Sequence, residues 1–199
     1  MQKRIRRIPA VFPAVFGTRL FFLRRVWYNG NMERIACFDP VIGENSRVLI
    51  LGTMPSVRSL QENFYYAHPG NAFWKILGEA YGCEVFTVEQ KRAVILENGL
   101  ALWDVMRSCE RSGSLDSAIR NPIPNDFAAL FERYPDIRRV LFNGAKAEEC
   151  FLRLAGETLG GREAVRLPST SPANTLAYTQ KRRLWLEELQ RMDVKVTPR

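Results

Sequence analysis

A short aromatic segment, Tyr65–Trp74 (Y-Y-A-H-P-G-N-A-F-W), holds the side chains with the clearest chemical potential. The amide of Asn71 can both donate and accept a hydrogen bond, so it could hold a water molecule. The two tyrosines that open the segment offer flat faces, and Tyr66 is a candidate for stacking on a planar base. Ordinary roles remain open, because Asn71 could equally be the N-cap of the following helix. His68, beside a proline, is more typical of a loop hydrogen bond than of a catalyst.

Two further segments follow apolar runs that are typical of buried strands. In Gly52–Ser56 (G-T-M-P-S) a glycine and a proline fix a tight turn, whose backbone N–H groups could cradle an anion or a carbonyl. Asn143, before Gly144, could read the edge of a base with one donor and one acceptor. Both segments are also compatible with ordinary turns, in which Asn143 would stabilise its own backbone.

The segment Leu167–Asn174 (L-P-S-T-S-P-A-N) places three hydroxyl groups between two prolines. A rigid loop rich in donors is suited to binding phosphates, and its hydroxyl residues are Ser169, Thr170 and Ser171. Lys181, Arg182 and Arg183 lie in the first turns of the last predicted helix, where cations oppose the helix dipole. An external anion is therefore a reasonable partner for them, although a solvated basic face remains an alternative.

These candidates depend on an alternation of strands and helices. The apolar runs predict strands at Arg47–Leu51, Leu100–Trp103, Arg139–Phe142 and Ala164–Leu167. Helical spacing and caps predict helices after Asn71, over Glu89–Asn98, over Phe127–Tyr134 with Asn125 as N-cap, after Gly144, and over Tyr178–Met192. Arg107–Pro124 is polar and indicates turns. The pattern predicts a three-layer α/β/α domain around a mainly parallel four-stranded sheet, in which ligands gather beyond the carboxyl ends of the strands.

Composition limits the class of protein. The chain has 199 residues, of which 46% are hydrophobic, which suits one globular domain. The net charge of +8 is uneven, because residues 1–31 hold seven basic and no acidic residues and the remainder is nearly neutral. We therefore expect a folded domain over 32–199, opening at Met32. Residues 1–31 would be an upstream extension that is dispensable or not translated, or else an extra arm.

The cysteines and the apolar runs exclude further classes. Cys37, Cys83, Cys109 and Cys150 are isolated and His68 is the single histidine, so the spacing supports no metal site, and we expect no cofactor. Buried thiols in a reducing cytoplasm are the expected state. Apolar runs are far shorter than the ~20 residues of a membrane helix, which argues against a transmembrane protein. We expect a monomer.

Taken in order, the motifs resemble those of the uracil-DNA glycosylase superfamily. They are G-T-M-P-S, Y-Y-A-H-P-G-N-A-F-W, L-W-D-V, N-D-F, F-N-G-A-K-A and L-P-S-T-S-P-A-N. As a set they are most similar to the hypoxanthine-DNA (deoxyinosine) glycosylase branch, and the resemblance spans about Ile35 to Leu189. It implies an enzyme that acts on DNA, single- or double-stranded, containing a deaminated base.

The resemblance also implies roles for single residues. Met54 stands where relatives carry a polar residue that activates water, so Asn71 is the candidate catalytic residue. Base-binding positions would be Gly52, Thr53, Met54, Tyr66 and Asn143. Phosphate-binding positions would be Ser56, Ser169, Thr170, Ser171, Lys181 and Arg182. Relatives often have a leucine wedge within the last loop, where this chain has hydroxyls, with Leu167 at the start.

The implied reaction is hydrolysis of an N-glycosidic bond in DNA without lyase activity. Two alternatives remain: an enzyme of the same fold that acts on uracil or on thymine opposite guanine, and a non-catalytic protein that binds damaged DNA. Asp104, at the end of a predicted strand, could hold a loop or approach the site.

Overall fold

The computed structural model describes residues 25–26 and 34–191 of the chain. Its centre is a four-stranded parallel sheet in the order β4-β3-β7-β8. The strands are β3 (Val48–Gly52), β4 (Leu100–Asp104), β7 (Arg139–Asn143) and β8 (Glu163–Leu167). All four lie where the apolar runs predict them.

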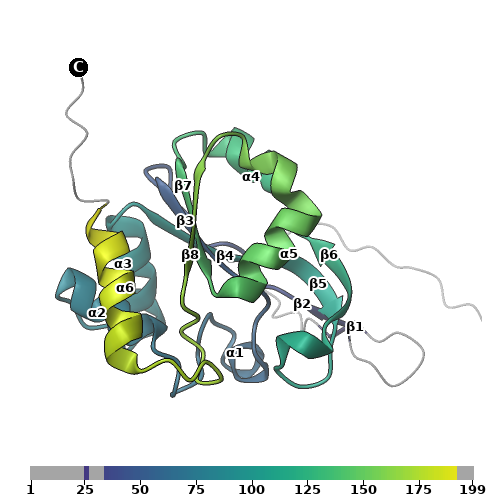
Figure 1. Cartoon of the computed structure of the whole chain (residues 1–199), viewed down its shortest axis with the longest axis horizontal. Coiled ribbons are helices and arrows are strands. Elements are labelled where there is room, and N and C mark those ends of the chain that lie inside the picture. Colours follow the sequence, from purple (N-terminus) through teal and green to yellow (C-terminus); the bar gives the residue numbers. More distant parts are fainter. Residues whose placement is uncertain (1–24, 27–33, 192–199) are drawn as a thin grey trace, which may run out of the picture.

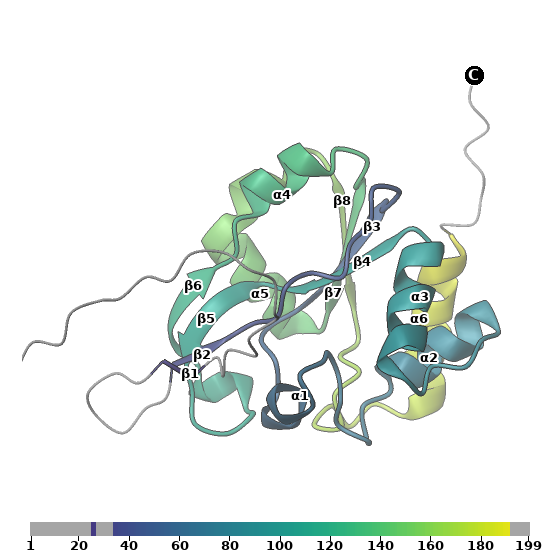
Figure 2. The same cartoon turned by 180° about the vertical axis from the view of Figure 1, so that it is seen from behind.

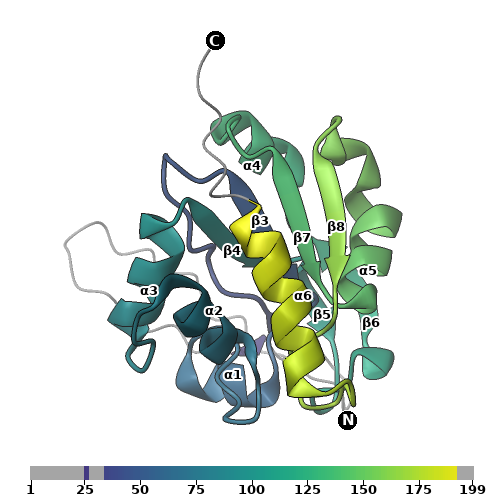
Figure 3. The same cartoon turned by 60° about the vertical axis from the view of Figure 1, so that its left-hand side comes forward.

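Helices cover both faces of this sheet, as Figures 1 and 3 show. On one face lie α2 (Phe73–Tyr81), α3 (Val88–Glu97) and α6 (Tyr178–Gln190); on the other lie α4 (Phe127–Arg133) and α5 (Ala145–Ala155). Alternate residues of β3 point to opposite layers, so Ile50 joins the core beneath α2 and α6 while Leu51 joins the core beneath α4 and α5. The predicted three-layer α/β/α fold is confirmed.

A second, antiparallel sheet lies beside the first, in the order β1-β2-β5-β6. Its strands are β1 (Arg25–Val26), β2 (Arg34–Ala36), β5 (Met106–Glu110) and β6 (Arg120–Pro124). The prediction of turns over Arg107–Pro124 is therefore wrong in part. The pairing of β5 with β6 shifts register twice, and the buried residues of β5, Met106 and Cys109, are three apart. This irregularity hides the period of two that would signal a strand.

Short elements complete the described chain. They are α1 (Val57–Glu62) and the 3₁₀ turns η1 (Asp116–Ala118) and η2 (Gly156–Leu159). Asn125 is not the N-cap of α4, because the Asp126 carboxylate accepts from the Ala129 amide instead. The buried Asn125 donates to the Asp104 carbonyl oxygen (2.8 Å) and so fixes the end of β4.

Three of the four thiols, those of Cys37, Cys109 and Cys150, are buried as expected, whereas Cys83 is exposed. Over the described ranges, no cluster of three or more His, Cys, Asp and Glu side chains could hold a metal ion. No helix in those ranges is long and apolar enough to cross a membrane. Of the predicted extension 1–31, only Arg25–Val26 is described, and it pairs with β2. The remainder of the extension and Met192 lie outside the described residues.

Candidate active site

The carboxyl ends of the parallel strands meet at one edge of the sheet, the lower edge in Figure 1. The register places Gly52 of β3 beside Asp104 of β4, and Asn143 of β7 beside Leu167 of β8. The loops that follow β3 and β8, called here the first loop (Thr53–Ser56) and the last loop (Pro168–Asn174), therefore leave the same end of the sheet, with the end of β7 between them. This edge brings together most of the predicted site residues.

Gly52 allows two polar side chains to reach the floor of this edge. A Cβ atom at this position would lie 2.5 Å from Asp104 Oδ1 and 2.8 Å from the Tyr66 hydroxyl oxygen, closer than real Cβ contacts. Only glycine fits without displacing them. Gly52 thus contributes to the predicted site by making room for a carboxyl and a phenol, rather than by a side-chain contact.

Asp104 and Tyr66 each carry a buried polar atom that lacks a hydrogen-bond partner in the described part of the chain, Oδ2 and the hydroxyl oxygen. Asp104 is 2% exposed. Burial, reinforced by the charge of Asp116 and opposed by that of Arg111, raises the pKa of Asp104 to about 7. Buried groups without partners are rare in folded proteins and often mark functional sites.

The two adjacent tyrosines have different environments. Tyr65 is buried, its hydroxyl donates to the Asp39 carbonyl oxygen (3.1 Å), and it belongs to the core. Tyr66 has a left-handed backbone (φ 50°), its ring centroid lies 4.3 Å from that of Phe73, and its side chain stays partly accessible. Burial and then the charge of Asp104 raise the pKa of the Tyr66 hydroxyl, which therefore stays protonated. Of the two tyrosines, only Tyr66 keeps part of its surface accessible to a ligand.

Asn71 lies just before α2 and its Oδ1 accepts from the Phe73 amide (3.0 Å). The Asn71 side chain therefore does cap α2, although by backbone angles the N-cap residue is Ala72. Capping uses one lone pair of the oxygen and leaves the other, with the amide NH₂, for a ligand. The Ala72 amide donates to the Thr170 carbonyl oxygen (3.0 Å), which fastens this segment to the last loop.

Asn143 and Thr170 satisfy each other. The Asn143 Nδ2 donates to Thr170 Oγ1 (2.9 Å), the Thr170 amide donates to Asn143 Oδ1 (2.8 Å), and both residues are buried. Both side chains take part in this pair, and the base-binding role expected for Asn143 and the phosphate-binding role expected for Thr170 stay predictions. Together the two side chains fasten the last loop to the end of β7.

Three serines are compatible with the phosphate-binding prediction, because their oxygens accept from backbone amides and a hydroxyl can still donate. Ser56 accepts from the Ser59 amide (3.1 Å), Ser169 from that of Ser171 (3.3 Å), and Ser171 from that of Ala173 (3.2 Å). All three are partly accessible. Ser56 Oγ also shares a hydrogen bond with Ser59 Oγ (3.0 Å), in which either oxygen can be the donor. Ser169 and Ser171 can donate to a ligand without losing their loop contacts, and Ser56 can do so when Ser59 is the donor.

The predicted phosphate-binding cations are engaged elsewhere. Lys181 is buried, and its ammonium donates to the carbonyl oxygens of Ser171 (3.2 Å) and Asn174 (2.7 Å). Arg182 forms an ion pair with Glu79 of α2. Arg183 pairs with Glu187 one turn further along α6. Lys181 therefore closes the last loop and Arg182 joins α6 to α2, while the phosphate-binding roles expected for Lys181 and Arg182 stay predictions.

The side chains of Thr53 and Met54, at the start of the first loop, are buried. Met54 is buried in the core beneath α4 and α5, so any contact that it makes with a base is through its backbone. Thr53 is also buried, and its hydroxyl bonds the Asp116 carboxylate. The carbonyl oxygens of Gly52 and Thr53 accept from the amides of Val105 (2.8 Å) and Met106 (3.2 Å), which fixes the path of the loop.

Sequence reasoning missed the charges that surround the first loop. The buried Arg111 guanidinium donates to the carbonyl oxygens of Pro55 and, at 2.9 Å, Gly113. Burial raises the pKa of Asp116, on the other side of the turn. Both lie in the polar segment that predicted only turns, and nothing in its pattern shows that the segment folds back on the first loop.

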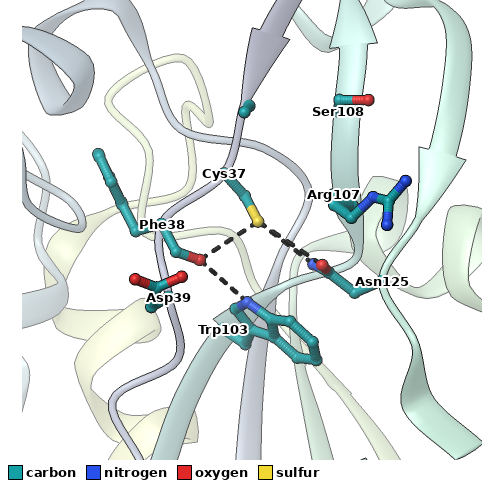
Figure 4. A pocket seen from close by; sticks show the side chains of 8 residues that line it. Cys37, Phe38, Asp39, Trp103, Arg107, Ser108 and Asn125 are labelled. Atoms are coloured by element: carbon teal, nitrogen blue, oxygen red, sulfur yellow. Dashed lines mark hydrogen bonds between the residues drawn. The ribbon is translucent and has the colours of Figure 1, made fainter. Parts of the chain in front are cut away.

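A separate hollow lies behind β4, between it and the antiparallel sheet. Figure 4 shows it lined by Cys37, Phe38, Asp39, Trp103, Arg107, Ser108 and Asn125. The Trp103 indole donates to the Phe38 carbonyl oxygen (3.0 Å), and Asn125 Nδ2 lies 3.4 Å from Cys37 Sγ. None of the predicted site residues lines this hollow, and its contacts tie β2 to β4.

Comparison with known families agrees with this arrangement. The Uracil DNA glycosylase superfamily matches residues 40–194, which include every strand of the parallel sheet. The chain belongs to this superfamily. The Asn71 segment and the first and last loops of this superfamily member all fall within the matched range.

Individual relatives are similar over most of the chain. A Methanosarcina acetivorans protein named hypoxanthine DNA glycosylase is 41% identical over 69% of this chain and 86% of its own length. A Methanosarcina barkeri protein of the same name is 35% identical over 77% and 97%. A solution NMR structure from M. acetivorans, titled as a candidate uracil DNA glycosylase, superposes with a TM-score of 0.69, at 36% identity, over 80% of this chain and 98% of that one.

Proposed function

We propose that the protein is a monofunctional DNA glycosylase that removes hypoxanthine from deoxyinosine in DNA, as a step of base excision repair. The superfamily supports a DNA glycosylase, and the names of the two Methanosarcina relatives support hypoxanthine as the base. The observation that carries the proposal is the meeting of Asn71, Tyr66 and the three phosphate-binding serines at one edge of the sheet.

Binding starts with the displaced nucleotide. A base must leave the stack before its glycosidic bond is accessible, which costs a few kcal/mol and less for a mispaired, deaminated base. Ser56, Ser169 and Ser171 donate to the flanking phosphates. Tyr66, supported from behind by Phe73, stacks on the extruded base.

In the chemical step a water oxygen bonds to C1′ of the sugar and the bond from C1′ to N9 of the purine breaks. The bonding electrons leave with the base, which is released as hypoxanthine after it gains a proton, and the water loses one. Asn71 holds the attacking water through the second lone pair of Oδ1 and the NH₂ group. Backbone N–H groups of Gly52–Met54 stabilise the negative charge that develops on the base.

The position of Lys181 supports a hydrolytic rather than a lyase mechanism. A Schiff-base lysine must reach the sugar carbon as a free amine. Lys181, the lysine closest in sequence to the last loop, is buried and donates to two loop carbonyl oxygens. We therefore expect an intact abasic site as the product.

A substrate panel tests the proposal. Duplexes that carry one hypoxanthine, uracil, xanthine or mismatched thymine are incubated with the protein, and abasic sites are revealed by alkaline cleavage. The proposal predicts cleavage at hypoxanthine, and none without alkali. Release of uracil or thymine alone would assign the protein to the alternative specificity, and binding without release would assign it to damage recognition without catalysis.

A further inference from the structure

An exposed leucine stands on the rim of the candidate site. Leu115, in the connection between β5 and β6, has 65% of its surface exposed, which makes it one of the few large apolar side chains open to solvent in the described residues. The connection lies at the same edge of the molecule as α1, as Figures 1 and 2 show from opposite sides. Single exposed apolar side chains are common on protein surfaces, so the significance of Leu115 depends on where it lies and on what fixes it there.

The backbone around Leu115 is anchored to the first loop on both sides. Ser114 Oγ accepts from the Val57 amide (2.9 Å) at the start of α1. On the other side, the Asp116 carboxylate bonds the hydroxyl of the buried Thr53. The Arg111 guanidinium closes the same turn by donating to the carbonyl oxygens of Pro55 and Gly113. Leu115 is therefore an exposed side chain on a fixed support, next to the residues that surround the extruded base.

The last loop offers no comparable group. The residues Pro168–Asn174 present prolines, an alanine and polar side chains, and Leu167 at its start is buried in the core. The wedge position expected from the family resemblance is thus occupied by hydroxyls. A protein that extrudes a base leaves a gap in the stack, and apolar wedges commonly fill such gaps between base steps.

We propose that Leu115 is the wedge that enters the base stack and fills the gap left by the extruded nucleotide. This inference rests on the proposed function, because it needs a DNA substrate from which a base is displaced. It moves the wedge from the last loop to the turn between β5 and β6. The partly exposed Val57, bonded to the same turn, continues the apolar rim.

The test compares Leu115→Ala with Phe86→Ala, a matched control because Phe86 is 78% exposed and lies just before α3, outside the loops of the candidate site. Single-turnover release of hypoxanthine is measured on a duplex and on the same strand without its complement. We expect Leu115→Ala to slow release from the duplex by roughly tenfold or more and to leave single-strand release within about twofold, since only a duplex needs a wedge. Leu115→Met should restore most of the duplex rate, and Phe86→Ala should change neither rate.

A second readout separates failure of the wedge from failure of the proposed function. A 2-aminopurine placed beside the deoxyinosine in the duplex becomes brighter when the neighbouring base is extruded, whether or not cleavage follows. The wild type and Phe86→Ala should raise this fluorescence, and Leu115→Ala should not. The inference would be overturned if Leu115→Ala lost activity equally on the duplex and on the single strand. It would also be overturned if Leu115→Ala kept the duplex activity and the fluorescence increase of the wild type. A wild type that releases no hypoxanthine from either substrate would instead overturn the proposed function, and the fluorescence would still test Leu115.

Discussion

The first and last loops leave the same end of the sheet, but the polar groups in and beside them are hydrogen-bonded to different degrees. In the last loop, Thr170 and Asn143 bond each other and the Lys181 ammonium closes the loop on two carbonyl oxygens. Beside the first loop, the Tyr66 hydroxyl and Asp104 Oδ2 are buried without partners. The last loop therefore acts as a rigid support, whereas the floor of the first loop keeps polar groups in an unfavourable state that a substrate or its water could relieve.

Gly52→Ala should have the largest effect, because it disturbs the buried polar groups beside the first loop. The new methyl group would collide with Asp104 Oδ1 and the Tyr66 hydroxyl. We expect the free energy of unfolding to fall by about 2–4 kcal/mol and base release to fall by more than about 100-fold, because both groups must move. Urea denaturation and single-turnover release measure the two effects. Gly156→Ala is the control for a glycine substitution as such, because Gly156 has φ −57° and the added Cβ would make only ordinary contacts with Leu152, at 3.9 and 4.0 Å.

Asp104→Asn tests the same buried groups through the pH dependence of stability. The pKa of Asp104 is raised from 3.8 to about 7, so this group stabilises the fold fully below pH 4, and that contribution is lost as the pH rises through 7. The wild type should therefore lose up to about 4 kcal/mol of stability between pH 4 and pH 8 relative to Asp104→Asn. Denaturation at a series of pH values measures the difference. Parallel profiles for the two proteins would show that Asp104 is not held in its neutral form.

Thr170→Val tests the hydrogen-bonded pair that holds the last loop. The substitution keeps the shape of the side chain but leaves the buried Asn143 Nδ2 without its acceptor, which should cost roughly 1–3 kcal/mol. Thermal unfolding measures the loss. Ser169→Ala, in the same loop, removes a partly accessible hydroxyl and should change stability by less than about 0.5 kcal/mol. Equal stability of the two variants would mean that the Asn143–Thr170 pair does not hold the loop.

Arg182→Ala should have the smallest effect. Arg182 pairs with Glu79 at the partly exposed contact between α2 and α6, and such pairs contribute about 0–1 kcal/mol. Because this guanidinium is directed at Glu79 rather than at the loops, DNA affinity should keep the salt dependence of the wild type. Titration of labelled duplex at several salt concentrations checks this. A slope that falls by about one would restore Arg182 as a phosphate ligand.

The central sheet could be predicted because β3, β4 and β7 each hold a run of at least three consecutive apolar residues, and β8 a shorter one. The antiparallel sheet could not, since the register shifts in β5 place Met106 and Cys109 three residues apart. Within the site, residue type and the family resemblance select Asn71 and Tyr66 as candidates, and their roles stay predictions. Residue type could not show the contacts of Lys181, because the carbonyl oxygens that it binds come close only when α6 packs against the last loop.

The most direct measurement compares the wild type with Asn71→Ala on a deoxyinosine duplex, with binding and single-turnover release followed separately. The control is Asn45→Ala, an amide in the turn before β3, at the opposite end of that strand from the site. The account predicts that Asn71→Ala lowers the release rate by roughly 100- to 1,000-fold while affinity for the duplex is retained. Near-normal release by Asn71→Ala with unchanged binding would contradict the assignment of Asn71 as the catalytic residue.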